Sequence, residues 1–253
     1  MSLKVSLITA TSNSLNTLEM CMDSVLSQTY DNIEYIIVDG LSNDGTIELI
    51  KDKAKTYHNI NWISEIDNGI YDALNKGLSM ASGDIIGFIH SDDYLARPST
   101  IENVINAFEA QPADGVYGNL HYVNYADINQ IVRNWISQPF HQKLLNRGWM
   151  PAHPTLFLKK EVYENCGKFN LEYNIAADYD FILRVFSHSD YKFYFLPEVI
   201  VKMRVGGASN RSLKNILEKT KEDFRAAKTN GLTIPFKVIL QKNLAKIPQW
   251  FKK

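Results

Sequence analysis

The amino-acid sequence predicts an α/β fold, with a mostly parallel central sheet flanked by helices and followed by a C-terminal helical extension. Short apolar runs alternate with segments of helical spacing throughout residues 1–95. Such alternation is typical of strand–helix–strand crossovers, which make the strands parallel. The run over residues 33–38 is almost wholly apolar, as expected of a strand that helices cover on both faces.

The first half of the chain contains four expected strands and three expected helices. Apolar runs predict strands at residues 5–9, 33–38, 61–65 and 85–90. Apolar residues at every third or fourth position predict helices at residues 14–28, 46–57 and 69–82. The turn-rich sequence DGLSNDG at residues 39–45 leads into the second of these helices.

The second half is less regular. Its sequence predicts strands at residues 115–124 and 193–204, and a loop followed by a short strand within residues 149–159. Helices are expected at residues 99–111, 176–188 and 211–230, and a glycine-rich loop at residues 206–210. The sequence from Ser99 to Glu102 has the pattern of a capping box, in which the two side chains satisfy backbone N–H groups at a helix start.

Composition excludes several classes of protein. The chain has 253 residues, 45% hydrophobic content and a net charge of −1, so it can bury a sizeable core and shows no global affinity for nucleic acid. Its two cysteines suit a reducing compartment, and no run of 18 apolar residues predicts a membrane span. The first residues lack the apolar region of a signal peptide, so we expect a cytoplasmic protein.

Polar residues follow each of the first four expected strands. They are the segment Thr9-Ala10-Thr11, then Asp39, Asp67 and the pair Asp92-Asp93. Parallel sheets bind their ligands beyond the carboxyl ends of the strands, so one crevice is expected to collect these residues. Adjacent carboxylates at such an edge suit a hard divalent cation that bridges phosphate oxygens.

Five segments of the sequence form a recognisable set in chain order. They are VSLITA (5–10), IIVDGLSNDGT (36–46), SEIDNGIYDALNKG (64–77), HSDD (90–93) and AADY (176–179). Together they resemble the family 2 glycosyltransferases of GT-A fold, over about residues 4–210, and the likeness is greatest to bacterial enzymes of colanic acid, capsule and O-antigen assembly. The resemblance implies a GT-A domain over residues 1–210, with a nucleotide-binding half at 1–95 and an acceptor-binding half at 96–210. Residues 211–253 would form a helical basic tail.

The resemblance also implies an activity. It is the inverting transfer of a sugar from a nucleotide-diphosphate donor, with UDP favoured, to a hydroxyl of a glycan or polyprenyl-linked acceptor. The implied cofactor is Mn²⁺ or Mg²⁺. By position, Asp39 would accept from the nucleotide base, Asp92 would lie near the ribose, Asp93 would bind the metal and Asp178 would be the catalytic base. This division suits the chemistry, because a metal stabilises the leaving diphosphate while a carboxylate deprotonates the acceptor.

Further residues match the family by position. The implied nucleotide contacts are Thr9, Ala10, Thr11, Asn13, Asp67, Asn75 and Lys76. Three more are candidates for donor or acceptor contacts, namely His153, Trp149 and Arg204.

The sequence departs from the family pattern at Ser91 and at Ala177, where many members carry an acid. The second departure leaves Asp180 as a rival base to Asp178. Both departures keep open a second hypothesis, a nucleotide-sugar-binding protein with impaired catalysis. A third, a sugar nucleotidyltransferase, is less favoured because residues 9–14 contain no basic residue for a phosphate loop.

The C-terminal segment is basic and apolar. Residues 232–253 contain five lysines and no acidic residue, interleaved with apolar side chains. This composition favours peripheral contact with the inner face of the cytoplasmic membrane. The alternative is a C-terminal helix that packs on the core and leaves its lysines in solvent.

Overall fold

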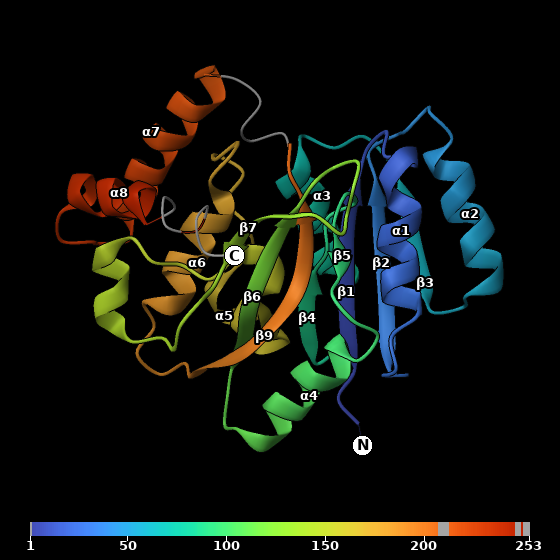
Figure 1. Ribbon diagram of the computed structural model, residues 1–253, viewed down its shortest axis with the longest axis horizontal. Coiled ribbons are helices and arrows are strands. Elements are labelled where there is room, and N and C mark those ends of the chain that lie inside the picture. Colours follow the sequence, from blue (N-terminus) through green and yellow to red (C-terminus); the bar gives the residue numbers. More distant parts are fainter. Residues whose placement is uncertain (1, 207–212, 246–248, 250–253) are drawn as a thin grey trace.

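The computed structural model describes residues 2–206, 213–245 and 249, and its centre is one mixed sheet (Figure 1). The strand order is β3-β2-β1-β4-β8-β6-β9-β5, with β7 paired to β6. The strands are β1 Val5–Thr11, β2 Ile33–Asp39, β3 Ile60–Ser64, β4 Ile85–Phe88, β5 Tyr94–Leu95, β6 Gly115–Val123, β7 Ile131–Trp135, β8 Phe157–Lys159 and β9 Phe193–Arg204.

Helices cover both faces of the sheet. The α-helices are α1 Leu15–Leu26, α2 Thr46–Thr56, α3 Ile70–Met80, α4 Thr100–Ala110, α5 Lys160–Cys166, α6 Ala177–Phe186, α7 Leu213–Thr229 and α8 Pro235–Leu244. Two short 3₁₀ turns, η1 Gln142–Arg147 and η2 His153–Thr155, precede β8. The α/β class, the flanking helices and the C-terminal helices confirm the predicted fold class.

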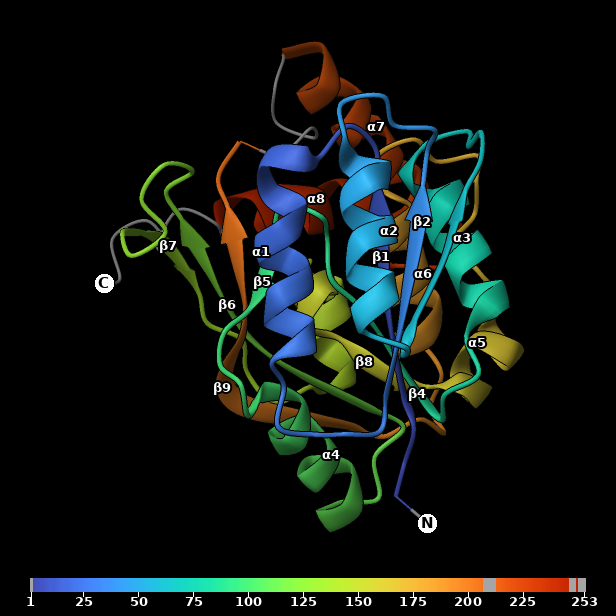
Figure 2. The ribbon, with the colours of Figure 1, turned by 90° about the vertical axis from the view of Figure 1, so that its right-hand side faces the viewer.

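Two apolar cores result from the alternation of side chains along the strands. Leu7, Tyr35 and Ile37 face α1, α2 and α4 on one side of the sheet. Ile8 and Ile36 face α3, α5 and α6 on the other. Figure 2 shows α1 and α2 on one side of β1 and β2, with α3 and α6 on the opposite side.

The first four strands are parallel, as predicted, and their register aligns their carboxyl ends. Thr11 of β1 pairs with Asp39 of β2, and Asp39 pairs with Ser64 of β3. Phe88, the last residue of β4, pairs with Ile8. The segment after β4 therefore starts beside the ends of β1 and β2, which is the edge where the sequence predicted a crevice.

Antiparallel pairs enter the sheet in the second half. β8 is antiparallel to both β4 and β6, and β5 is antiparallel to β9. β5, β7 and α5 were not predicted. β5 has only two residues and α5 only seven, so neither is long enough to produce a periodic pattern.

The predicted capping box is wrong, although the helix is present. The Ser99 side chain makes no capping hydrogen bond. Instead, Thr100 Oγ1 accepts the N–H of Arg97 at 3.0 Å, and Glu102 accepts from Thr29 Oγ1 at 2.8 Å. Glu102 therefore hydrogen-bonds Thr29, which is distant in the sequence, and not the backbone N–H groups at the start of its own helix.

The C-terminal helices pack on the core. Ala226 and Ala227 of α7 and Val238 and Ile239 of α8 are buried in the same core as α6. The alternative of a packed helix with solvated lysines does not describe Lys242, which is 5% exposed and lies 2.8 Å from the buried Asp223. No helix of the described part of the chain is long and apolar enough to cross a membrane.

Two predicted segments fall outside the described residues. The loop at residues 206–210 is described only at Gly206, and the tail after residue 245 only at Gln249.

Asp223→Ala is expected to lower the free energy of unfolding by about 3–5 kcal/mol, because it leaves the Lys242 ammonium buried without its carboxylate. Urea unfolding followed by circular dichroism measures the change. Glu218→Ala, on the exposed face of the same helix, is the control and should shift stability by less than about 0.5 kcal/mol. A loss below about 1 kcal/mol for Asp223→Ala would contradict a structural role for this pair.

Candidate active site

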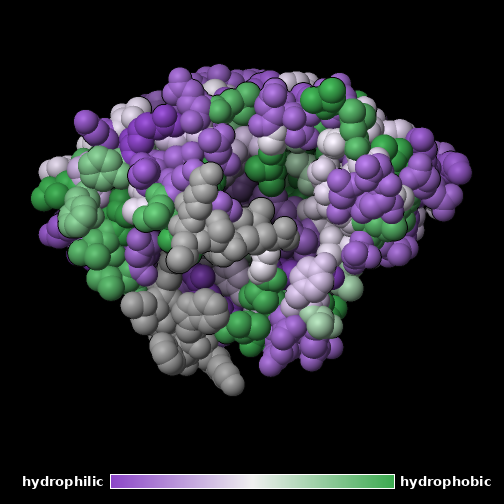
Figure 3. All heavy atoms as spheres, turned by 90° about the horizontal axis from the view of Figure 1, so that it is seen from above, coloured by the Kyte–Doolittle hydropathy of each residue, from purple (hydrophilic) through white to green (hydrophobic). Residues whose placement is uncertain are grey.

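The carboxyl ends of β1, β2 and β4 open onto one face of the molecule. Figure 3 shows this face, which is hollowed near its centre and carries hydrophilic side chains around the hollow. Asp39 ends β2 and is fully buried. Its Oδ2 accepts the N–H of Ser42 at 3.0 Å and the hydroxyl of Ser64 at 2.7 Å, while its Oδ1 accepts the Ser42 hydroxyl. Asp39 thus shapes the loop that follows β2.

Asn13 and Asp67 adjoin the same loop. Asn13, with a left-handed φ of 49°, accepts the N–H of Asn43 at 3.0 Å and donates its own N–H to Ser42 Oγ at 2.7 Å. Asp67 accepts the N–H of Gly69 at 2.9 Å in the turn before α3. A Cβ at Gly40 would lie 2.5 Å from Asp67 Oδ2, so glycine permits this close approach.

The segment from Thr9 to Thr11 has mixed roles. Thr9 is fully buried and donates to the Ile89 carbonyl at 2.8 Å, so it ties β1 to the segment after β4. Ala10 belongs to the apolar core. Thr11 Oγ1 is buried and has no hydrogen-bond partner among the described residues, so of the three it is the one left with unused hydrogen-bonding capacity at the strand end.

Asn75 and Lys76 are held by neighbouring protein groups. The Asn75 amide bonds both backbone groups of Phe169, donating to its carbonyl at 2.9 Å and accepting its N–H at 3.0 Å. Lys76 lies 2.9 Å from Glu65 and 3.6 Å from Asp72. These contacts fix α3, and the predicted donor contacts of both residues remain predictions.

Asp93 lies where β4, its following turn and β9 meet. It is fully buried; Oδ1 accepts the N–H of Arg204 at 3.3 Å, and Oδ2 has no hydrogen-bond partner among the described residues. Burial, and then the charge of Asp92, raise the pKa of Asp93 well above its ordinary value. Arg204 adds a guanidinium that donates to the Asp92 carbonyl at 2.5 Å and lies over the Tyr94 ring.

The unpartnered oxygen of Asp93 fits a divalent cation. A buried carboxylate oxygen without a donor is costly, and a hard cation is the partner that relieves this cost. No group of three or more His, Cys, Asp or Glu side chains within residues 2–206, 213–245 and 249 is arranged to hold a metal. The protein would therefore supply few ligands, with phosphate oxygens and water supplying the others.

Two histidines, His90 after β4 and His153 of η2, lie close to each other. His90 Nδ1 and His153 Nε2 are buried without hydrogen-bond partners among the described residues, and the rings are 6.1 Å apart. His153 stacks on Phe88 at 5.2 Å. Burial lowers the pKa of His90 and lowers that of His153 to about 4, so both rings are neutral at pH 7. His153 was a candidate from the sequence, whereas His90 was not; the only sequence signal for His90 is its position just before Ser91 and Asp92.

Asp178 stands in the first turn of α6 and is half-buried. Its Oδ1 accepts the N–H of Tyr179 at 2.8 Å and lies 3.2 Å from the Tyr71 hydroxyl of α3. Burial raises the pKa of Asp178, but the positive charges of Lys219 and Lys242 and the hydrogen bond from the Tyr179 N–H act in the opposite direction, and the pKa lies below its ordinary value. Asp178 is therefore ionised at neutral pH, as a general base must be.

Asp180 and Trp149 are occupied elsewhere. Asp180 is 3% exposed and pairs with Arg184 at 3.0 Å and with the Asn230 amide at 3.0 Å. Trp149 packs in an aromatic cluster with Phe140, Tyr117 and Phe186.

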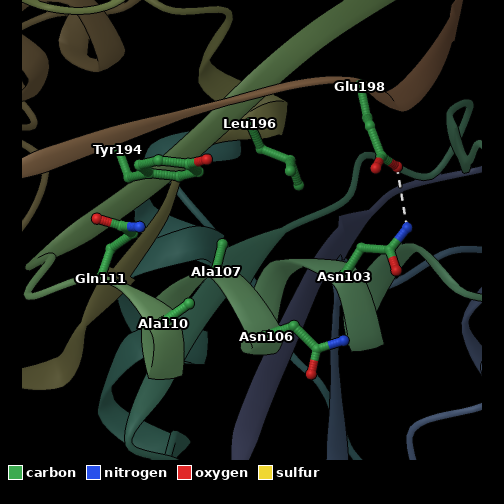
Figure 4. Close-up of a pocket in the computed structure, with 8 residues that line it drawn as sticks. All are labelled: Asn103, Asn106, Ala107, Ala110, Gln111, Tyr194, Leu196 and Glu198. Carbon is green, nitrogen blue, oxygen red and sulfur yellow. Dashed lines mark hydrogen bonds between the residues drawn. The ribbon is translucent and has the colours of Figure 1, made fainter.

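A separate surface groove lies between α4 and β9 (Figure 4). Asn103 donates to Glu198 there at 2.9 Å, and Tyr194 and Gln111 lie at its other end. None of the predicted site residues lines it.

Comparison with known proteins identifies the family. The sequence profile described as "Glycosyl transferase family 2" matches residues 6–167. The chain belongs to this family. A "PGL/p-HBAD biosynthesis glycosyltransferase" of Mycobacterium bovis (strain BCG / Pasteur 1173P2) is 29% identical over 216 residues, which cover 81% of this chain and 78% of the relative. An uncharacterized glycosyltransferase of Mycobacterium tuberculosis is 31% identical over 182 residues, 71% of this chain and 68% of the relative.

Solved structures of glycosyltransferases share the fold. Residues 1–349 of S. aureus TarS in complex with UDP-GlcNAc match 95% of this chain and 72% of that chain, with a TM-score of 0.71 and 15% identity. The mannosyltransferase PcManGT from Pyrobaculum calidifontis, in complex with GDP-Man and Mn²⁺, matches 96% of this chain and 69% of that chain, with a TM-score of 0.67 and 20% identity. The predicted family and GT-A fold are confirmed for this family 2 glycosyltransferase.

His153→Phe is expected to reduce the loss of stability in acid. The pKa of His153 is about 4 when folded and 6.5 when unconstrained, so between these values the unfolded state binds more protons. The stabilising effect of the neutral ring is complete above pH 6.5 and is lost as the pH falls. From pH 7 to 5, the wild type should lose about 2 kcal/mol more unfolding free energy than His153→Phe, which keeps a ring on Phe88. Urea unfolding at both pH values measures this, and equal losses would contradict it.

Proposed function

We propose that this family 2 glycosyltransferase transfers a sugar, with inversion, from a nucleotide-diphosphate sugar to a hydroxyl group. The proposal is carried by two carboxylates in different environments, which lie near one pair of neutral histidines. Asp93 has an oxygen that no described residue hydrogen-bonds, which suits a cation, and Asp178 is ionised and can accept a proton. The negative charges of Asp92 and Asp178 both act to raise the pKa of His90, which supports placing them in one site.

The donor is proposed to bind along the edge formed by residues 9–13, Asp39 and Asp67, with Asp92 toward the ribose. UDP is the favoured nucleotide, because TarS, which has the same fold, is in complex with UDP in one structure and with UDP-GlcNAc in another. GDP and dTDP remain alternatives, since PcManGT is in complex with GDP-Man. Arg204, close to Asp92 and Asp93, is a suitable cation for the diphosphate.

The reaction requires a group that stabilises the departing diphosphate and a group that removes a proton from the acceptor. A bound Mn²⁺ or Mg²⁺, held by Asp93, would act as the Lewis acid for the diphosphate. Asp178 would accept the proton of the acceptor hydroxyl, with its carboxylate oriented by Tyr71 and the Tyr179 N–H. The neutral imidazoles of His90 and His153 offer hydrogen bonds to sugar or phosphate oxygens without adding charge.

The acceptor is proposed to be a glycan or a polyprenyl-linked sugar of bacterial surface polysaccharide assembly, reached at the inner face of the membrane. α8 supports this, because Phe236, Leu240 and Leu244 stand four residues apart and are 73%, 50% and 53% exposed. Hydrophobic residues gather at the left edge of Figure 3, where α8 lies in Figure 1. An apolar stripe in a segment with lysines and no acids suits an anionic lipid surface.

Calorimetric titration of UDP, GDP and dTDP, each with and without Mn²⁺, is expected to show metal-dependent binding of one nucleotide. Asp93→Asn keeps the shape of the side chain and should remove the gain from Mn²⁺, about tenfold or more in Kd. Asp127→Asn, on an exposed loop, is the control. If the nucleotide Kd changes neither with Mn²⁺ nor with the Asp93→Asn substitution, the proposed metal role is wrong. If no nucleotide binds, the proposed donor site is wrong.

Asp178→Asn is expected to lower kcat by about 10²–10⁴-fold without weakening nucleotide binding, because the amide cannot take up a proton. Release of nucleoside diphosphate from UDP-GlcNAc or GDP-mannose measures turnover. Asp180→Asn is the matched control and should lose stability while keeping most of kcat, since Asp180 is paired with Arg184. If Asp180→Asn loses kcat and Asp178→Asn keeps it, Asp180 is the base. Nucleotide binding without turnover by the wild type would favour the impaired, binding-only protein.

The double variant Phe236→Ser and Leu240→Ser is expected to abolish binding to vesicles of phosphatidylglycerol and phosphatidylcholine. The wild type should cosediment with them at low salt and less so at high salt, because its lysines are attracted to anionic lipid. Ile136→Ser, which changes a side chain 60% exposed elsewhere, is the control. Failure of the wild type to bind at low salt would contradict membrane contact.

A further inference from the structure

A single glutamate of α7 holds the backbone that leads into the proposed base. Glu222 Oε1 accepts the N–H of Asn174 at 3.0 Å. Its Oε2 accepts the N–H of Ile175 at 2.8 Å and that of Ala176 at 2.9 Å. These N–H groups stand at the start of α6, where a helix leaves donors without partners. One carboxylate therefore satisfies three consecutive donors, two residues before Asp178.

Tyr71 of α3 holds the same segment from the other side. Its hydroxyl lies 2.7 Å from the Ile175 carbonyl oxygen and 3.2 Å from Asp178 Oδ1. Both backbone groups of Ile175 are therefore fixed, the N–H by Glu222 and the carbonyl by Tyr71. Because the hydroxyl that fixes Ile175 also faces Asp178, a shift of residues 174–176 moves the base relative to its own partner.

The helix that carries Glu222 is itself firmly anchored. Arg225, one turn after Glu222, donates to the Glu172 carbonyl at 2.6 Å and covers the Tyr173 ring at 4.0 Å. Asp223 pairs with the buried Lys242 of α8, and the Asn230 amide donates to Asp180 of α6. α7 thus holds residues 172–176 through two side chains one helical turn apart, and it cannot shift without breaking buried contacts.

We propose that Glu222 is a positioning residue of the transfer reaction, which acts through the backbone of residues 174–176 to set the place of Asp178. The inference rests on the proposed function, in which Asp178 is the base. It makes the C-terminal helices part of the catalytic apparatus, because the residue that orients the base comes from α7. Glu222 itself contacts no reacting atom in this scheme, since its two oxygens are engaged with the backbone.

Glu222→Ala is expected to lower kcat by about 10- to 100-fold, the effect of a displacement of about 1 Å at a reacting group. Turnover is measured as nucleoside diphosphate release from UDP-GlcNAc or GDP-mannose, at a temperature well below the Tm of the variant. Calorimetric Kd for the nucleotide with Mn²⁺ should stay within about twofold of the wild type, because residues 174–176 do not form the donor edge. Glu218→Ala, exposed one turn earlier on α7, should match the wild type in both measurements.

A merely structural cap predicts a different pattern. If Glu222→Ala lowers Tm but keeps kcat, or if kcat and nucleotide affinity fall together, the positioning role is wrong. Should Glu222→Ala not fold, Glu222→Gln carries the same test with a smaller expected loss in kcat, since its one remaining oxygen still accepts a backbone N–H. Asp178→Asn is assayed in parallel. If it retains turnover, the proposed base is wrong; if it loses turnover while the folded Glu222 variants keep theirs, only the positioning inference is wrong.

Discussion

Asp93 is buried at the junction between the regular first half of the sheet and its irregular second half, and the described residues form a hydrogen bond with only one of its oxygens. Its Oδ1 takes a backbone N–H from Arg204 at the end of β9, and its Oδ2 has no hydrogen bond from the described residues. Such a group opposes folding unless the surrounding packing holds it or a cation joins it. The parallel register of β1, β2 and β4 provides that packing, and β9 provides the N–H. The fold thus maintains a carboxylate oxygen ready for a ligand.

The proposed base is held in the opposite manner. Asp178 is stabilised in its charged form by lysines of α7 and α8, and its backbone is held by Glu222 of α7. Asp93 therefore has few hydrogen-bond partners among the described residues, whereas Asp178 is surrounded by groups that stabilise its charge or hold its backbone. This difference suits a division of labour in which Asp93 needs a cation and Asp178 needs to be ionised and well placed.

Local sequence signals predicted the first half of the fold well. Apolar runs and helical spacing gave β1 to β4 and α1 to α3 within a few residues, because each is long and periodic. The candidate residues after these strands were chosen because parallel sheets bind their ligands beyond the carboxyl ends of the strands. Several elements of the second half were not predicted, because β5 is only two residues long and η1 is a 3₁₀ turn without a periodic pattern. Contacts of long range were also invisible: Asn75 with Phe169, Asp180 with Arg184 and Asn230, and Glu222 with the start of α6. The role of Lys242 was missed because no sequence pattern distinguishes it from the exposed lysines of the same tail.

The position of the metal relative to Asp93 is the most direct test of the role proposed for this carboxylate. Crystals grown with UDP and Mn²⁺ allow the ion to be located by its anomalous scattering. We expect a peak within coordination distance, about 2.0–2.5 Å, of Asp93 Oδ2, with oxygens of the diphosphate as further ligands and Arg204 nearby. A peak elsewhere at full occupancy, or nucleotide bound in the same cleft with Asp93 still buried and uncoordinated, would contradict the claim that this carboxylate is the metal ligand of the site.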